Sequence, residues 1–304
     1  MKICVIQTRV GIGDLCIFLP YIQFIAKYKR SKITLITKAR TQAKEILKYD
    51  PYINCIEYID EKKNKNFFLY KFLKKKKFNE IYIMHFSFKF FIFSFLSGIN
   101  KIYYYGFFKN KESITKFINK KIKSWLKIKE IKYKCRIYEK KNNKNNKNNI
   151  VIGIGGSGLN KKWPVINYVK LISHLNKIFK NSKFIIAGGF DEKKDANFIR
   201  KSLHKKIKLL SLCNKTINDS IRHISNSKFY VGNDTGFMHL CASLRTFSFG
   251  LFGDTPINYA SYNNLIKPIM PKGRKFITHN DKAMNKIKVN HVINEIQKCV
   301  QLIK

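Results

Sequence analysis

The sequence is short of acidic residues, of paired cysteines and of uninterrupted apolar segments, and each shortage excludes a class of protein. Only 18 Asp and Glu residues stand against 61 Lys and Arg, which gives a formal net charge of +43. The seven cysteines are scattered and form no C-x-x-C pair, so no disulfide framework or zinc site is indicated, as expected in a reducing cytoplasm. Hydrophobic residues still make up 45% of the 304 residues, which predicts a folded core and leaves room for two domains.

The positive charge has two explanations. It would attract an anionic partner, such as a nucleic acid, a membrane surface or a phosphorylated substrate. The alternative is codon drift in an AT-rich genome, because only eight of the basic residues are Arg while Lys, Asn, Ile and Phe abound. Basic residues are spread along the whole chain without a nucleic-acid-binding motif, so nucleic-acid binding is the remoter alternative and no specific nucleic-acid partner is expected.

One stretch, residues 81–99, is apolar enough to raise the question of a membrane span. His85 and Lys89 interrupt it, whereas a spanning helix needs about 20 nearly uncharged residues. We therefore predict a buried strand over 80–85 followed by a helix over 88–96. The opening residues are apolar too briefly for a signal peptide, since Arg9 and Asp14 follow closely.

Short apolar runs alternate with helical patterns, which predicts parallel sheets in an α/β fold. In the first half, strands are expected at 2–8, 32–38, 53–59, 80–86 and 101–107, and helices at 15–30, 40–50, 67–77 and 88–96. In the second half, strands are expected at 149–154, 183–189, 207–213, 228–234 and 246–253, and helices at 163–179, 192–203, 217–227, 236–244 and 282–304.

The polar run at 139–149, EKKNNKNNKNN, separates the two halves. We predict an N-terminal Rossmann-like domain at 1–140, a linker at 141–149 and a C-terminal Rossmann-like domain at 150–304. A surface loop inside one domain is the alternative to a linker. The terminal helix is a candidate to pack back on the first domain, and a ligand is expected in the cleft between the two sheets.

The stretch Asn-Asp-Thr-Gly at 233–236 stands where a strand gives way to a helix. The N–H groups of a helix's first turn favour anions, so this corner is predicted to hold a diphosphate. Thr235 adds a hydroxyl, Gly236 permits close approach, and His239 lies one turn further on. Asp234 would repel phosphate and is expected to accept from sugar hydroxyls; plain helix capping is the alternative.

Two further glycine-rich turns carry charged residues. Ser157 and Lys161 follow the first strand of the second half, where a Lys can supply positive charge to phosphate. Gly11 and Gly13 form the matching turn of the first half, and Asp14 stands where a dinucleotide site would place pyrophosphate. An acid there suits a general base on a hydroxyl, with a helix-capping Asp as the alternative.

These motifs resemble glycosyltransferase family 9, the ADP-heptose:lipopolysaccharide heptosyltransferases and their relatives. The matching elements, in order, are R-x-G-x-G-D at 9–14, G-S-x-x-x-K-x-W-P at 156–164, G-G-x-D-E at 188–192, N-D-T-G-x-x-H at 233–239 and G-x-T-P at 253–256. The resemblance implies a GT-B fold, in which two Rossmann-like domains face each other across a cleft. It also implies an inverting, metal-independent transfer of a heptose, or a related sugar, from an ADP-sugar donor. The absence of a D-x-D motif and of a His/Cys ligand cluster agrees with the last point, so neither a metal nor a cofactor is expected.

Carried over by position, the resemblance makes Asp14 the base and assigns Ser157 and Lys161 to the diphosphate. Asp234, Thr235, Gly236 and His239 would hold the sugar and pyrophosphate, and Asp191 or Glu192 would meet the ribose. Arg9 and Arg40 are the candidates for acceptor binding. A different donor sugar, or a family member without catalysis, is the alternative.

The implied acceptor is an anionic glycolipid, the lipopolysaccharide core or a similar glycan, at the cytoplasmic face of the inner membrane. A peripheral contact with that membrane is expected, with residues 67–78 as the candidate surface. The alternative for this segment is a solvated Lys face whose Phe residues lie in the core.

Overall fold

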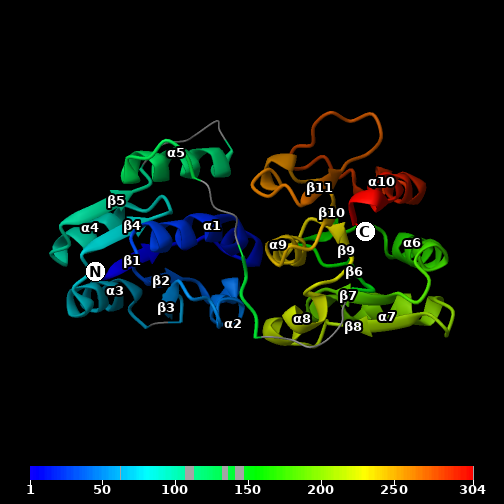
Figure 1. The fold of residues 1–304 in the computed structure, drawn as a ribbon, viewed down its shortest axis with the longest axis horizontal. Coiled ribbons are helices and arrows are strands. Elements are labelled where there is room, and N and C mark those ends of the chain that lie inside the picture. Colours follow the sequence, from blue (N-terminus) through cyan, green and yellow to red (C-terminus); the bar gives the residue numbers. More distant parts are fainter. Residues whose placement is uncertain (62, 107–112, 132–135, 141–146, 304) are drawn as a thin grey trace. The chain divides into compact units, whose positions relative to one another are not determined.

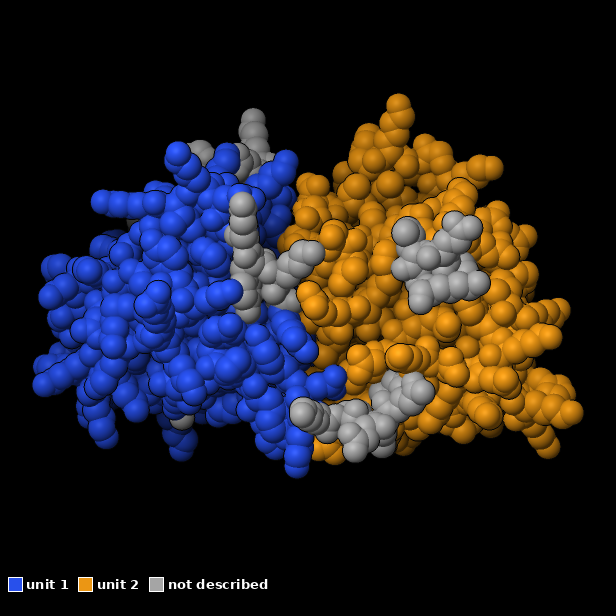
Figure 2. Space-filling model, viewed as in Figure 1, with its two compact units in different colours: residues 1–140 blue, residues 141–304 orange. Residues whose placement is uncertain are grey.

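The computed structural model describes residues 1–61, 63–106, 113–131, 136–140 and 147–303. The chain divides into two compact units, residues 1–140 and 141–304, which Figure 2 shows in separate colours. Each unit is built on its own parallel sheet (Figure 1), so the predicted α/β class with two parallel sheets is confirmed. Of the predicted linker, residues 141–146 lie outside the described residues, and its last residue, Asn149, already belongs to a strand.

Unit 1 contains a five-stranded parallel sheet in the order β3-β2-β1-β4-β5. Its strands are β1 (Ile3–Ile6), β2 (Ile33–Thr37), β3 (Ile53–Tyr58), β4 (Glu80–Ile83) and β5 (Lys101–Tyr104). Its helices are α1 (Ile12–Tyr28), the 3₁₀ turn η1 (Ala39–Thr41), α2 (Ala43–Ile46), α3 (Lys65–Lys76), α4 (Phe88–Leu96) and α5 (Ile114–Leu126).

The core of unit 1 follows from side-chain alternation along the buried strands. Cys4 of β1 and Ile81 of β4 pack in one cluster with Leu73 of α3 and Phe90 of α4. The helices α3 and α4 also pack against one another, as α1 does with α5. The segment at 81–99 therefore forms a buried strand and a helix, as predicted.

Unit 2 contains a six-stranded parallel sheet in the order β11-β10-β9-β6-β7-β8. Its strands are β6 (Asn149–Gly153), β7 (Lys183–Ala187), β8 (Lys208–Ser211), β9 (Phe229–Asn233), β10 (Ser248–Leu251) and β11 (Ile266–Ile269). Its α-helices are α6 (Val165–Ile178), α7 (Lys193–Ser202), α8 (Ile217–Ile224), α9 (Gly236–Ser243) and α10 (Val289–Ile303). Its 3₁₀ turns are η2 (Leu159–Lys161), η3 (Phe190–Glu192), η4 (Ile257–Tyr259) and η5 (Met284–Lys286). The terminal helix α10 packs against α6 of its own unit.

Several elements differ from the sequence-based expectation. The helix predicted at 40–50 is broken at Gln42, whose left-handed backbone (φ 55°) ends η1 and leaves only the short α2. The helix α5 was not predicted, although Ser113 caps it by accepting a hydrogen bond from the Lys116 N–H. The edge strand β11 was also missed, and its Lys267 and Pro268 hide the apolar signal of a strand.

The order of the strands creates one switch point in each sheet. In unit 1 the chain runs from β1 outward to β3 and then returns to β4 on the other side of β1. In unit 2 it runs from β6 outward to β8 and returns to β9 on the other side of β6. Ligands of open α/β sheets bind at the carboxyl ends of the strands beside such a reversal. The loops after β1, β4, β6 and β9 are therefore the places to look for chemistry.

Candidate active site

The buried side chain of Asn233 joins the two loops at the switch point of unit 2. Its amide nitrogen donates hydrogen bonds to the carbonyl oxygens of Ile154 (3.1 Å) and Gly155 (2.8 Å). Its amide oxygen accepts from the Tyr168 hydroxyl (2.7 Å) and the Trp163 N–H (3.1 Å). A buried amide with all its hydrogen-bonding capacity used fixes the geometry of both loops. Asn233 was not among the predicted site residues, although a polar residue that ends a buried apolar strand is a usable signal.

The N-terminus of α9 forms the corner of this switch point. Thr235 is the N-cap residue with extended backbone (φ −144°, ψ 172°), yet within the described chain its hydroxyl makes no capping hydrogen bond. The hydroxyl oxygen lies 3.5 Å from the Tyr230 hydroxyl instead. Gly155 passes close by, because a methyl group on it would lie 3.9 Å from Thr235 Cγ2. The first-turn N–H groups of α9, beginning at Gly236, are thus next to a glycine turn, as an anion site requires.

Asp234, which is partly exposed, and the buried His239 form a pair on the same corner. The Asp234 Oδ1 lies 3.3 Å from the His239 Nε2, and the Nδ1 of the same ring lies 3.0 Å from the Tyr262 hydroxyl. Both ring nitrogens are therefore engaged within the protein. A direct contact from His239 to a diphosphate would require one of these two bonds to open. Tyr262 was not among the predicted site residues, because it lies in an irregular segment without a motif.

The turn after β6 carries two consecutive lysines, Lys161 and Lys162. Ser157 is exposed and Lys161 is half-buried at the end of η2. The next residue, Lys162, extends across the turn, where its Nζ lies 2.7 Å from the Glu192 Oε1. Ser157 and Lys161 therefore both lie at the predicted loop, and Lys162 is a further cation there that was not predicted.

Glu192 and Asp191 occupy different environments at the turn after β7. Glu192 is buried, and its Oε2 accepts a hydrogen bond from the Gly189 N–H at 2.7 Å. Gly188 leaves room for this side chain, because a methyl group there would lie 2.9 Å from the Glu192 Cβ. Asp191 is exposed. Both remain candidates for the ribose, with Asp191 accessible and Glu192 already engaged in holding the loop.

Asp14 lies in the first turn of α1 and is oriented by Arg9. The helix begins at Ile12, three residues before the predicted start, so Asp14 occupies its third position. The Arg9 Nε lies 3.0 Å from the Asp14 Oδ1, and both side chains are partly exposed. Among the described residues, none donates a hydrogen bond to the Asp14 Oδ2. A carboxylate with one oxygen held and one available to a substrate hydroxyl has the arrangement that a general base needs.

The remaining predicted residues of unit 1 are the two glycines of this turn and Arg40. Gly11 is the N-cap residue of α1 and has φ 113°, a backbone conformation that disfavours other residues. Gly13 lies within the first turn of α1. Arg40 lies exposed on η1, in the segment that follows β2.

His85 is a further residue at the switch point of unit 1 and was not predicted. It follows β4, and its Nδ1 is buried without a hydrogen-bond partner among the described residues. Burial lowers the pKa of His85, the positive charges of Arg9 and Lys38 lower it further, and the Asp14 carboxylate opposes them. His85 therefore places a neutral imidazole near the charged side chains of Arg9, Lys38 and Asp14.

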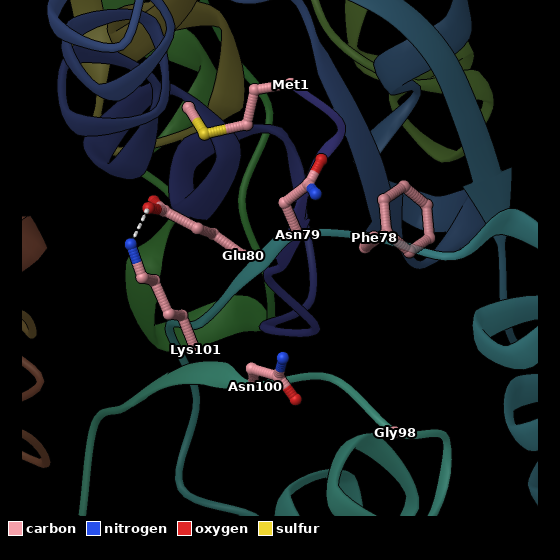
Figure 3. Close-up of a pocket in the computed structure, with 7 residues that line it drawn as sticks. All are labelled: Met1, Phe78, Asn79, Glu80, Gly98, Asn100 and Lys101. Carbon is pink, nitrogen blue, oxygen red and sulfur yellow. Dashed lines mark ion pairs between the residues drawn. The ribbon is translucent and has the colours of Figure 1, made fainter.

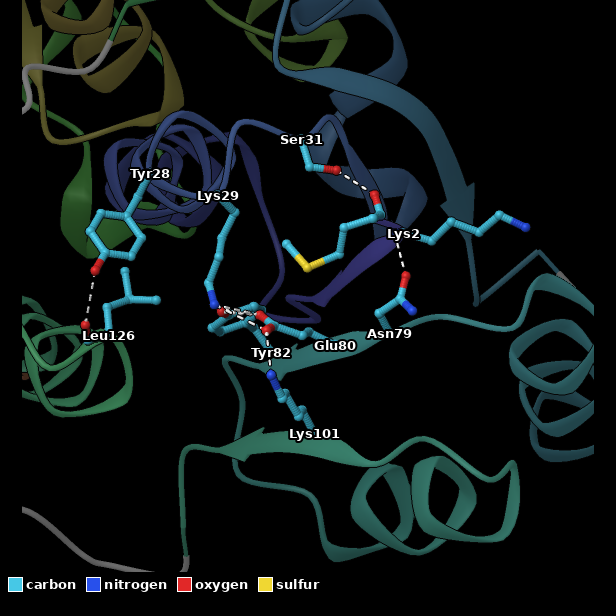
Figure 4. Close-up of polar contacts among 10 residues, drawn as sticks. Lys2, Tyr28, Lys29, Ser31, Asn79, Glu80, Tyr82, Lys101 and Leu126 are labelled. Atoms are coloured by element: carbon cyan, nitrogen blue, oxygen red, sulfur yellow. Dashed lines mark hydrogen bonds and ion pairs between the residues drawn. The ribbon is translucent and has the colours of Figure 1, made fainter.

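The end of the unit 1 sheet at which the strands begin carries a cavity of about 360 Å³ (Figure 3). Asp14 instead follows the carboxyl end of β1. The lining residues of the cavity are Met1, Phe78, Asn79, Glu80, Gly98, Asn100 and Lys101. The buried Glu80 carboxylate is held by the Lys29 Nζ at 2.9 Å and by the Tyr82 hydroxyl at 2.8 Å (Figure 4). Burial alone would raise the pKa of Glu80, but these two hydrogen bonds keep that pKa below its ordinary value. This network closes an end of the sheet where substrates of α/β folds do not bind.

Within the described ranges, no three His, Cys, Asp or Glu side chains cluster closely enough to hold a metal ion. Of the helices in the described part of the chain, none combines the length and the apolar character that a membrane span requires.

Comparison with known proteins agrees with this picture. The model of glycosyltransferase family 9 (heptosyltransferase) matches residues 109–291. No curated protein sequence matches the chain.

Several solved structures share the fold over the whole chain. The E. coli ADP-heptose lipopolysaccharide heptosyltransferase II has 18% identical residues and a TM-score of 0.78, with 99% of each chain covered. A family 9 glycosyl transferase from Veillonella parvula has 13% identity and a TM-score of 0.79, covering 99% of this chain and 97% of that one. The E. coli heptosyltransferase WaaC with ADP has 12% identity and a TM-score of 0.75, covering 98% of this chain and 99% of that one.

Proposed function

Because the chain belongs to glycosyltransferase family 9, the heptosyltransferase family, we propose that it transfers a heptose, or a related sugar, from an ADP-sugar to a lipopolysaccharide core or similar anionic glycan. Family membership is the observation that carries the proposal. The ADP part has the support of fold-sharing proteins whose names specify ADP-heptose or bound ADP.

In this proposal the donor binds at the switch point of unit 2. The N-terminus of α9, at Thr235 and Gly236, takes the diphosphate, since its first-turn N–H groups and helix dipole favour negative charge. Lys161 adds a positive charge, and Ser157 adds a hydroxyl donor. The Asp234 carboxylate would repel phosphate, so in this proposal it accepts hydrogen bonds from the sugar hydroxyls.

Transfer then requires one proton acceptor and one stabilised leaving group. The acceptor hydroxyl oxygen forms a bond to the anomeric carbon while the bond from that carbon to the diphosphate breaks. Asp14 takes the hydroxyl proton, and attack from the side opposite the leaving group inverts the anomeric centre. The charge that develops on the nucleoside diphosphate is met by Lys161 and the α9 N-terminus, without a metal ion.

A nucleotide panel tests the donor. We expect ADP, but not UDP or GDP at equal concentration, to raise the melting temperature of the protein. A stabilisation of about 2.7 kcal/mol is expected at a hundredfold excess over the dissociation constant. Incubation with ADP-heptose and a truncated lipopolysaccharide core should then release ADP, with or without EDTA.

Other outcomes select the alternatives. Stabilisation by UDP or GDP instead indicates another donor on the same fold. Stabilisation by ADP without turnover on any glycan acceptor indicates a non-catalytic family member. Tight, salt-dependent binding to DNA with no response to any nucleotide sugar contradicts the proposal altogether.

A further inference from the structure

The helix α4 is apolar on the side that faces the core and also on the side that faces solvent. Phe90 and Ser94 are buried, and Phe90 lies in the core cluster with α3. On the other side, Ile92, Phe95 and Leu96 are exposed, Phe95 by 68% and Leu96 by 58%. A helix on the surface of a water-soluble unit normally turns polar residues outward. The outward face of α4 therefore needs an explanation other than packing.

The neighbouring helix α3 supplies positive charge beside this apolar face. It packs directly against α4, and its Leu69 and Leu73 lie in the core cluster. Its exposed residues include Lys71 and Lys74, and the Lys71 Nζ lies 4.3 Å from the centre of the exposed Phe67 ring. Neither α3 nor α4 contains a single acidic residue.

This arrangement revises the surface expected at 67–78. Within that segment Leu69, Leu73 and Phe78 are buried, so α3 contributes lysines and one aromatic residue rather than a broad apolar face. The apolar part belongs to α4. We call the combined surface, formed by Phe67, Ile92, Phe95, Leu96 and Lys71, Lys74, Lys75 and Lys76, the α3–α4 patch.

We infer that the α3–α4 patch docks the protein on the surface of an anionic phospholipid bilayer. Exposed Phe and Leu side chains can enter the boundary between headgroups and acyl chains, while lysines beside them attract anionic headgroups. With nine residues, α4 is too short to cross a bilayer and fits a helix that lies in the interface. Charge complementarity favours a lipid surface, because the patch is all positive and the chain carries a net charge of +43.

Vesicle sedimentation tests the inference without donor or acceptor, so its result is independent of the proposed reaction. The full chain is mixed with vesicles of phosphatidylcholine alone and with vesicles that also contain phosphatidylglycerol. We expect binding only to the anionic vesicles, and its loss at high salt, because salt screens charges at the membrane surface.

Two patch variants separate the apolar and the charged contributions. The double variant F95S/L96S should weaken binding to anionic vesicles about tenfold or more, since two exposed apolar side chains no longer insert. The matched control is Phe276→Ser, because Phe276 is 67% exposed in unit 2, and it should change binding less than about twofold. Circular dichroism verifies that both proteins remain folded.

The charge variant K71E/K74E/K75E should weaken binding about a hundredfold, since each lysine near the surface contributes separately. Its control, K194E/K201E/K205E, changes the net charge equally but lies on and after α7. Equal loss in both triple variants means that overall charge alone binds the vesicles, which overturns the assignment of the patch. Absence of binding to anionic vesicles, or wild-type binding by F95S/L96S, also overturns it and leaves a protein partner as the occupant to seek.

Discussion

The Nζ of Lys162 lies 2.7 Å from the Oε1 of Glu192, while the Oε2 of the same carboxylate accepts the Gly189 N–H at 2.7 Å. One buried carboxylate thus connects the turn after β6 to the turn after β7. These turns flank the predicted diphosphate corner on its β7 side. The pair therefore fixes two loops beside the proposed donor site.

The variant Glu192→Gln should destabilise the fold. It keeps the size of the side chain but removes the negative charge, and it leaves the Lys162 ammonium without its partner. We expect a loss of about 1–3 kcal/mol in the free energy of unfolding, measured in urea. The neighbouring Asp191→Asn, at an exposed position, should change stability by less than about 0.5 kcal/mol. Equal stability of the two variants would contradict a structural role for Glu192.

The variant Asp14→Asn should separate turnover from donor binding. Loss of the proton acceptor is expected to lower kcat about 10²- to 10⁴-fold, while the affinity for ADP, measured by calorimetry, stays within about twofold. Asp219→Asn is a matched control, because Asp219 is the third residue of α8 as Asp14 is the third residue of α1. If Asp14→Asn keeps full activity, Asp14 is not the base.

The variant Tyr262→Phe should reveal whether the contacts of His239 matter for the donor. It removes the hydroxyl that lies 3.0 Å from the His239 Nδ1 and keeps the aromatic ring that stacks on the imidazole. With one ring nitrogen released, we expect the dissociation constant for ADP to change by about three- to tenfold while stability changes by about 1 kcal/mol. Tyr259→Phe, whose ring packs near His279, is the control and should leave ADP binding unchanged.

The variant Asn233→Ala should be among the most destabilising single changes in unit 2. It deletes four hydrogen bonds and leaves the Trp163 N–H and the Tyr168 hydroxyl to find other partners in a buried site. We expect a loss of about 3 kcal/mol or more in the free energy of unfolding. Asn197→Ala, on the exposed face of α7, should be neutral or slightly stabilising, because Ala is the better helix former.

The sequence predicted the fold well where local signals were strong. Alternation of apolar strands and amphipathic helices is a local pattern, and it located ten of the strands that the structure describes, missing the helix α5 and the strand β11. Glycine turns and the residues beside them were also visible, because their spacing is fixed by the turn itself. Contacts between distant loops leave no such local signal.

Lys162 and His85 illustrate what a single sequence does not reveal. Lys161 and Lys162 are the same residue type at neighbouring positions, and only Lys162 pairs with Glu192. That pairing depends on the η2 turn and on a residue thirty positions further along the chain. His85 lies near Arg9 only because β4 returns beside β1, so its surroundings depend on the order of the strands in the sheet. Both contacts form only in the folded chain, so neither the composition nor the spacing of residues could have predicted them.

The link between β11 and α10 should weaken in acid. Hydrogen bonds from Lys267 and then Lys298 lower the pKa of Glu295 to about 2, and the Lys267 Nζ lies 2.8 Å from its carboxylate. A folded-state pKa below the unfolded value means that the stabilisation is complete above pH 5 and is lost as the pH falls toward 2. The pair lies partly at the surface, so Glu295→Gln should cost about 1 kcal/mol at neutral pH. Urea unfolding of both proteins should show this difference shrinking as the pH is lowered through about 4, because the unfolded carboxylate takes up its proton first. A difference that stays constant or grows with acidity would mean that Glu295 acts by packing rather than by charge.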